Sequence, residues 1–163
     1  VRDNGGGNSG FAKIIVNRFA DNKRQVSFVR YRNGPDHDNF TDYIPQYIFP
    51  EGKRQYTKPV AVLTNRKSFS ATEYFVLAMR TLPHVTIIGD TTGGGSGIPI
   101  SRELPNGWAY RLPRSMQLTP DSVNYEGIGL APYIFVVNPY TDKIFSTDTQ
   151  LVRAVHFLEQ GRK

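Results

Sequence analysis

The chain has 163 residues, which is enough for one domain with a sizeable hydrophobic core. No run approaches the roughly 18 consecutive apolar residues that a membrane-spanning helix needs. The chain contains no cysteine, so disulfides and thiolate chemistry are excluded. The net charge of +6 is spread along the chain without a basic block, and we therefore expect no nucleic-acid partner.

The first third of the chain predicts one helix and one strand. Residues 1–4 resemble the end of a strand and lead into a glycine-rich turn over residues 4–10, so we expect the chain to begin inside a domain. A helix is expected over about residues 9–20, and a strand over residues 24–32. The residues at helical spacing are Phe11, Ile14, Ile15, Arg18 and Phe19. Residues 36–57 show no clear period and indicate an irregular excursion or a lid.

The middle of the chain predicts a β-α-β unit. A continuous apolar run over residues 59–64 is typical of a strand that is covered on both faces. A helix with one apolar face is expected over residues 70–82, and a second strand over residues 85–89. The two strands should be parallel and joined by a right-handed crossover.

The last third predicts a hairpin, a strand and a closing helix. A second glycine-rich loop covers residues 91–97, and the runs 98–104 and 108–112 flank Asn106-Gly107, which is a strong hairpin signal. Residues 133–137 are expected to form a strand, and residues 148–160 a helix. The apolar face of this helix is expected to contain Leu151, Val152, Val155 and Leu158.

Ser70 lies where the strand at 59–64 gives way to the helix at 70–82. Ser70 and Glu73 fit the capping-box pattern, which places the serine at the helix N-terminus. A hydroxyl there lies beside unpaired N–H groups, so a nucleophile and half of an oxyanion hole can be built together. The spacing alone is equally met by a serine that only caps the helix, and the two roles can coexist.

Other chemistries receive less support from the residues. Residues 5–10 match the G-x-G-x-x-G pattern of dinucleotide-binding folds, but the next strand offers Arg30 and Arg32 where a ribose-binding carboxylate is expected. Neither glycine loop contains the G-K-[ST] sequence of nucleotide-binding P-loops. The three histidines, His37, His84 and His156, do not have metal-ligand spacing. We therefore expect no metal and no cofactor.

Four segments resemble the C-terminal processing (tail-specific) serine peptidases. They are residues 1–7, Val-Arg-Asp-Asn-Gly-Gly-Gly; residues 59–73, with Ser-Ala-Thr-Glu at their end; residues 89–93, Gly-Asp-Thr-Thr-Gly; and residues 125–132, Tyr-Glu-Gly-Ile-Gly-Leu-Ala-Pro. The resemblance implies an α/β fold, a crotonase-like and ClpP-like ββα core with the parallel β-α-β unit and an added hairpin. It also implies that residues 1–163 are a single domain, the C-terminal larger part of a peptidase core whose N-terminal part lies upstream.

The resemblance also assigns roles within the site. Ser70 corresponds to the nucleophile, while Ala71 and Gly6 correspond to the oxyanion hole. Bacterial processing enzymes carry a catalytic lysine 25 residues after the serine, and here that position is Gly95. This departure favours the tricorn-like branch, in which a Ser-His-Ser-Glu tetrad includes a glutamate matched here by Glu126. The histidine and helper serine of that tetrad belong to a segment before residue 1, so residues 1–163 alone are expected to be inactive.

The expected partner is a peptide or protein substrate. Gly94, Gly95 and Ser96 are expected to bind it, and the strand at 98–104 to pair with an extended peptide. The resemblance also allows a homo-oligomer and favours a periplasmic or secreted location. The alternative is a non-catalytic ligand- or peptide-binding module on the same fold, similar to the retinoid-binding repeats.

Overall fold

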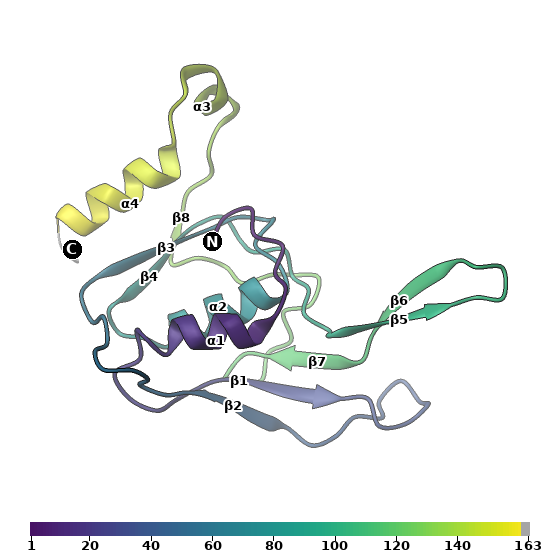
Figure 1. The fold of residues 1–163 in the computed structure, drawn as a ribbon. Helices are drawn as coiled ribbons and strands as arrows, with labels where there is room; N and C mark the ends of the chain where they lie inside the picture. Colours follow the sequence, from purple (N-terminus) through teal and green to yellow (C-terminus); the bar gives the residue numbers. More distant parts are fainter. Residues whose placement is uncertain (161–163) are drawn as a thin grey trace.

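The computed structural model describes residues 1–160 as a mixed α/β fold with two three-stranded sheets and a separate hairpin (Figure 1). The elements in chain order are α1 (Ser9–Val16), β1 (Arg24–Tyr31), β2 (Ile44–Ile48), β3 (Val60–Thr64), α2 (Ala71–Arg80), β4 (Val85–Gly89), β5 (Pro99–Glu103), β6 (Ala109–Pro113), β7 (Ser115–Leu118), β8 (Ile134–Phe135), α3 (Tyr140–Phe145) and α4 (Thr149–Glu159). Within the described part of the chain, every helix is too short or too polar to cross a membrane.

The predicted β-α-β unit is confirmed. Strands β3 and β4 are parallel, with Val62 opposite Ile87 and Thr64 opposite Gly89. Strand β8 extends this sheet beyond β4 but contains only two residues, where five were expected. Helix α2 contacts β4, while α4 contacts β3, so the apolar strands of this sheet are packed against helices, as their continuous hydrophobic run predicts.

The second sheet is antiparallel and has the order β2-β1-β7. The predicted strand β1 is confirmed, whereas the expectation of an irregular excursion over residues 36–57 is wrong, because β2 lies within it. Pro45 conceals β2 in the sequence, and it is tolerated because β2 is an edge strand with β1 on one side only. Strand β7, which was not predicted, covers the other edge of β1.

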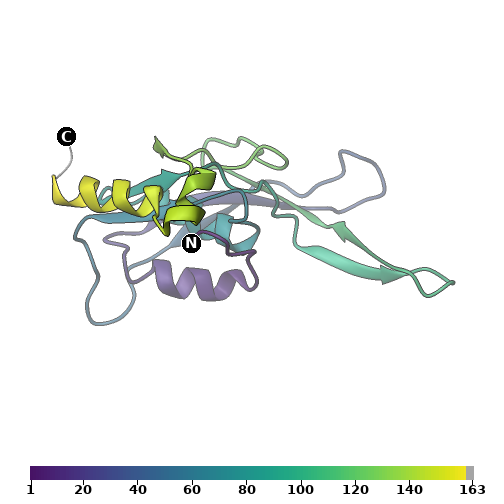
Figure 2. The same cartoon turned by 90° about the horizontal axis from the view of Figure 1, so that it is seen from above.

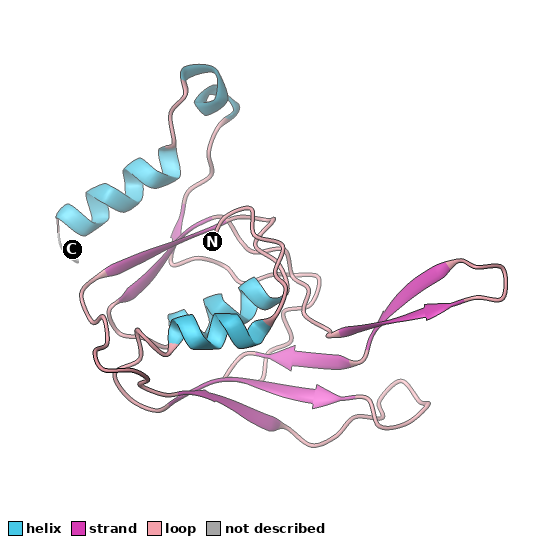
Figure 3. Cartoon of the chain, in the orientation of Figure 1, coloured by secondary structure: helices cyan, strands magenta, loops and turns pink. Residues whose placement is uncertain are grey.

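Helices α1 and α2 lie side by side, and α2 also contacts the antiparallel sheet (Figure 3). Helix α1 ends at Val16, four residues before the expected end. Its expected apolar face is largely at the surface, since Phe11 is 67% exposed and Ile14 57% exposed, while Val16 is buried. The main core instead surrounds α2, where Val76, Leu77, Ala78 and Met79 are at most 2% exposed.

The closing helix is confirmed, but its expected apolar face is not buried. Leu151, Val152, Val155 and Leu158 are 41–65% exposed, and Gln150 and Ala154 are buried instead. The Gln150 amide explains this orientation, because it donates hydrogen bonds to the carbonyl oxygens of Thr64 and Val136 at the end of the parallel sheet. A preceding short helix, α3, was not predicted.

The start of the chain contacts the parallel sheet and the start of α4. Residues 1–4 form a turn, not the expected end of a strand, although the Val1 amino group donates to the Leu63 carbonyl beside β3 (3.0 Å). Arg2 then forms a two-pronged ion pair with Asp148 at the start of α4, at 2.6 and 2.7 Å. The predicted hairpin of β5 and β6 is confirmed and extends away from the rest of the molecule (Figure 2).

Candidate active site

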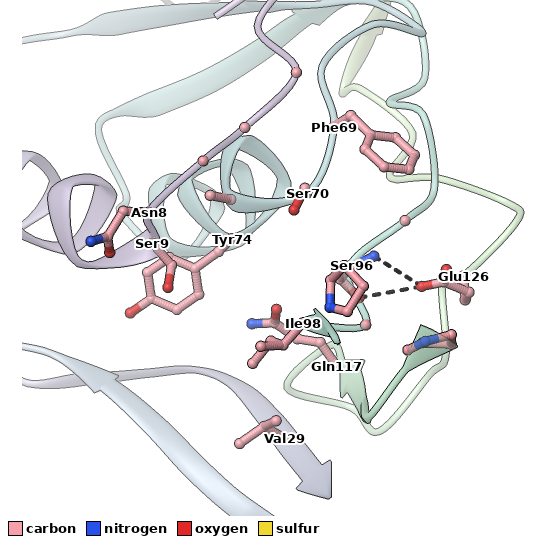
Figure 4. Close-up of a pocket in the computed structure, with 18 of the residues that line it drawn as sticks. Asn8, Ser9, Val29, Phe69, Ser70, Tyr74, Ser96, Ile98, Gln117 and Glu126 are labelled. Atoms are coloured by element: carbon pink, nitrogen blue, oxygen red, sulfur yellow. Dashed lines mark hydrogen bonds between the residues drawn. The ribbon is translucent and has the colours of Figure 1, made fainter. Parts of the chain in front are cut away.

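A cavity of about 930 Å³ opens between the N-terminal ends of α1 and α2, the antiparallel sheet and the base of the hairpin (Figure 4). The first glycine turn, residues 5–10, forms one wall, and residues 95–99 form another. Ser70 lies at the end of α2 between these walls. The two glycine loops, 86 residues apart at their starts, therefore meet at one serine.

Ser70 adopts a backbone conformation that few non-glycine residues take. Its φ of 59° and ψ of −120° place it in a sharp strand-to-helix turn, of the kind that exposes a nucleophilic serine in other hydrolases. Such strain costs about 1–3 kcal/mol and is typically found at functional sites. The Ser70 side chain makes no capping hydrogen bond, so the cap reduces to the Glu73 carboxylate, which accepts the Ser70 N–H at 3.0 Å.

The first glycine turn packs directly on this serine turn. A Cβ atom at Gly6 would lie 2.5 Å from the Phe69 carbonyl oxygen and 2.8 Å from the Ala71 nitrogen, and the Gly6 φ is +96°. Only glycine therefore fits this position. The close approach brings the N–H groups of the turn and of Ala71 into one corner of the cavity.

Asn4 holds the two turns together. Its side-chain oxygen accepts hydrogen bonds from Thr72 Oγ1 and from the Gly6 N–H, both at 2.9 Å, and its carbonyl accepts the Phe69 N–H. The Gly6 N–H is thus already bound within the protein. In contrast, the N–H groups of Gly7 and Ala71 have no acceptor among residues 1–160.

The sequence placed Glu73 in the capping box and at the end of the Ser-Ala-Thr-Glu segment, but it did not show that this carboxylate is buried. Its side chain is 0% exposed, and its carboxylate accepts four hydrogen bonds and faces no cation. The donors are Thr92 Oγ1 (2.6 Å), the Gly94 N–H (2.8 Å), the Gly95 N–H (2.8 Å) and the Ser70 N–H (3.0 Å). Glu73 therefore ties the second glycine loop to the serine turn. The sequence did contain one indication of this role, because Glu73 lies among the apolar residues of α2, and a carboxylate that is buried there must be hydrogen-bonded.

The second glycine loop meets the segment that contains Glu126. The Ser96 N–H donates to Glu126 Oε2 at 3.0 Å, and the Ser96 hydroxyl lies 3.4 Å from the same oxygen (Figure 4). Glu126 lines the same cavity as Ser70, yet its contact is with Ser96. Gly95 and Ser96 also line the cavity, whereas Gly94 lies behind it, with its carbonyl accepting the Gly127 N–H at 2.7 Å.

None of the described residues that line the cavity is a histidine. His37 is exposed and contacts Asp38, and Lys67 lies 3.7 Å from Asp3 outside the cavity. Burial raises the pKa of Tyr74, which lines the cavity, so its hydroxyl stays protonated at neutral pH. No cluster of metal-ligating side chains occurs within residues 1–160.

Gly95 occupies the position where the bacterial processing enzymes carry lysine. A Cβ atom there would lie 2.0 Å from the Phe69 ring, so no side chain fits without displacement of that ring. The Gly95 N–H is also bound to Glu73. Gly95 thus packs against the Phe69 ring, and a larger residue at this position would require that exposed ring to move.

A serine on a strained strand-to-helix turn, faced by free backbone N–H groups, is the arrangement found in serine hydrolases. Residues 1–136 match the sequence profile of peptidase family S41. The chain belongs to this family.

Both processing proteases and the tricorn protease are among the proteins that the chain resembles. The carboxy-terminal processing protease CtpA of Bacillus subtilis is 28% identical over 134 residues, which are 82% of this chain and 27% of that protein. The crystal structure of a candidate peptidase from Parabacteroides merdae matches with a TM-score of 0.91 and 38% identity, over 100% of this chain and 53% of that one. The tricorn protease shares the fold, with a TM-score of 0.70 and 20% identity over 100% of this chain and 15% of its own. The chain thus spans about half of the structural relative and about a quarter of the curated one.

Proposed function

We propose that this chain supplies the nucleophile side of a serine peptidase, which hydrolyses peptide bonds through an acyl-enzyme on Ser70. The observation that carries the proposal is the Ser70 turn. The Ser70 backbone is strained, its side chain makes no capping hydrogen bond, and a cavity opens in front of it. A serine that only caps a helix does not account for these three features.

The chemistry follows the order of acyl transfer. The Ser70 oxygen attacks the peptide carbonyl while its proton passes to a base, and the same base then protonates the leaving amine. Water subsequently cleaves the ester. The oxyanion is held by the Ala71 N–H together with a donor from the first glycine turn. The first candidate for that donor is the Gly6 N–H, which would have to give up its hydrogen bond to Asn4 when the substrate binds. The second candidate is the neighbouring Gly7 N–H, which has no acceptor among residues 1–160.

The base is proposed to come from outside residues 1–163. The absence of a histidine from the described cavity lining and the glycine at position 95 support a tricorn-like tetrad, in which a histidine and a serine are supplied by an upstream segment. Glu126 would stabilise the positive charge that develops on that histidine. Its position on the cavity wall supports this role.

The proposed substrate is an extended peptide or protein segment. The N–H groups of Gly94, Gly95 and Ser96 are all donated to carboxylates, so these three residues have no free backbone N–H for a substrate. The N–H of Gly97, which lines the cavity, has no acceptor among residues 1–160, and the Gly95 carbonyl has no donor there. A homo-oligomer remains a prediction from the family resemblance.

Labelling with a fluorophosphonate, followed by mass-spectrometric mapping in the full-length polypeptide, tests the nucleophile. We expect modification at Ser70 and loss of turnover in Ser70→Ala. Because no capping bond is lost, the free energy of unfolding of this variant should change by less than about 0.5 kcal/mol. Labelling at Ser68, or peptide binding without any labelling or turnover, would contradict the proposal. The second result would favour the non-catalytic binding module.

A further inference from the structure

Three successive backbone N–H groups in the second glycine loop each bind a carboxylate. Those of Gly94 and Gly95 donate to the two oxygens of Glu73, each at 2.8 Å, and that of Ser96 donates to Glu126 at 3.0 Å. One short loop therefore sets the positions of two acidic side chains that come from opposite sides of the site. Glu73 is held from α2, and Glu126 from the turn after β7.

Backbone packing fixes Ser96 and Glu126 relative to each other. The Gly127 N–H donates to the Gly94 carbonyl, and a Cβ atom at Gly94 would lie 2.7 Å from the Gly129 nitrogen. The loop and the turn at residues 127–129 are thus in direct contact. The approach of the Ser96 N–H to Glu126 is set by the backbone and does not depend on the Ser96 side chain, so a substitution at Ser96 removes only the hydroxyl contact at 3.4 Å.

The two oxygens of Glu126 are in different situations. Oε2 receives both the N–H and the hydroxyl of Ser96, whereas Oε1 has no hydrogen bond within residues 1–160. Glu126 is otherwise exposed, and an exposed carboxylate samples several rotamers unless a contact selects one. Ser96 supplies that contact.

Tyr125, the residue before Glu126, is buried. It is 2% exposed, and its hydroxyl is buried without a hydrogen-bond partner among residues 1–160. Burial raises the pKa of Tyr125, the adjacent Ser96 hydroxyl lowers it, and the charges of Glu73 and Glu126 raise it further. The neutral phenol thus lies beside Ser96 and near both carboxylates.

We propose that Ser96 is a positioning residue for Glu126: its N–H and hydroxyl hold Oε2, so that Oε1 faces the cavity and is available to the cationic base. This inference rests on the proposed role of Glu126 in proton transfer. It replaces the direct substrate contact that the resemblance implies for Ser96. Ser96 then acts on the reaction only through Glu126, which makes the proposal testable by a double-mutant cycle.

The experiment measures peptide hydrolysis by the full-length polypeptide carrying Ser96→Ala, Ser96→Thr and Glu126→Gln, singly and combined, with thermal unfolding to check that each variant is folded. We expect Ser96→Ala to lower kcat about 3- to 10-fold at unchanged KM, the range for one long hydrogen bond to a charged group. Ser96→Thr keeps the hydroxyl and should retain most of the activity. In the Glu126→Gln background, Ser96→Ala should have no further effect.

Several outcomes would overturn the inference. A rise in KM for Ser96→Ala at unchanged kcat would restore a substrate contact, and an additive effect in the Glu126→Gln background would show that Ser96 acts independently. If Glu126→Gln lowers kcat while Ser96→Ala is neutral, this inference alone fails. If Glu126→Gln leaves kcat unchanged while Ser70→Ala abolishes it, the proposed role of Glu126 fails and the inference falls with it.

Discussion

The two glycine-rich loops look alike in sequence but differ in what their N–H groups do. In the first, the N–H of Gly7 has no acceptor among residues 1–160, and Gly6 is pressed against the serine turn. In the second, the N–H groups of Gly94, Gly95 and Ser96 are all consumed by carboxylates. The comparison shows that a glycine run can either present donors to a ligand or brace acidic side chains. The acceptors that the fold places nearby decide which, since the Gly6 N–H is bound to the Asn4 side chain and the Gly97 N–H has no acceptor among residues 1–160.

The largest expected effect tests the first loop without the base that is proposed to lie outside residues 1–163. Residues 1–163 alone should retain the free donors of the first loop and lose proton transfer, so peptide hydrolysis should fall on the order of 10⁴–10⁶-fold relative to the full-length polypeptide. Turnover of a fluorogenic peptide measures this, with circular dichroism as the check on folding. Robust hydrolysis by residues 1–163 that disappears in Ser70→Ala would place the base inside this chain.

Within the first loop, Gly6→Ala should break the contact with the serine turn. The new methyl group would meet the Phe69 carbonyl and the Ala71 nitrogen, and the positive φ adds strain. We expect kcat/KM to fall on the order of 10²–10³-fold, as when an oxyanion donor is lost. Gly5→Ala is the matched control, because nothing lies within 4 Å of its Cβ position. Equal losses in the two variants would contradict a specific role for Gly6.

Glu73→Gln would convert the second loop into one with unpaired donors. In the wild-type chain each Glu73 oxygen accepts two hydrogen bonds. In the variant one of these oxygens is replaced by an NH₂ group, which cannot accept them, so two donors lose their acceptor and the loop is less firmly held. We expect a loss of about 1–3 kcal/mol in the free energy of unfolding. The fall in kcat should be on the order of 10- to 100-fold, because the serine turn and the loop lose their common anchor. Chemical denaturation and steady-state kinetics measure both, with the exposed Glu103→Gln as control.

The smallest expected effect concerns the ion pair between Arg2, which precedes the first loop, and Asp148. Hydrogen bonds from Arg2 lower the pKa of Asp148 well below its ordinary value near 3.8. A depressed carboxylate pKa stabilises the folded chain above that ordinary value, and the contribution is lost as pH falls below it. The free energy of unfolding should therefore fall by roughly 1 kcal/mol below pH 5 as Asp148 is protonated and its pair with Arg2 is lost. The effect is small because both side chains are partly exposed to solvent. Asp148→Asn should flatten this part of the pH profile, and an unchanged slope would contradict the assignment.

Local sequence patterns were sufficient for the elements that carry the serine. The apolar run of β3, the periodic face of α2 and the turn chemistry of Asn106-Gly107 each depend on neighbouring residues, and all three predictions are confirmed. The position of Ser70 at the junction followed from the same patterns. That the position 25 residues after Ser70 holds glycine and not lysine could also be seen, because it required only counting to Gly95.

The remaining features depended on contacts between distant residues. Strands β2 and β7 exist because they pair with β1, and the exposed apolar faces of α1 and α4 reflect which neighbours these helices meet. The loop donors of Glu73 lie 19 to 22 residues away, and Ser96 lies 30 residues from Glu126. A buried carboxylate is stable only where the fold assembles enough donors around it. The chain order shows neither the donors nor their number, so the tertiary structure alone decided which N–H groups of the two glycine loops are free and which are bound.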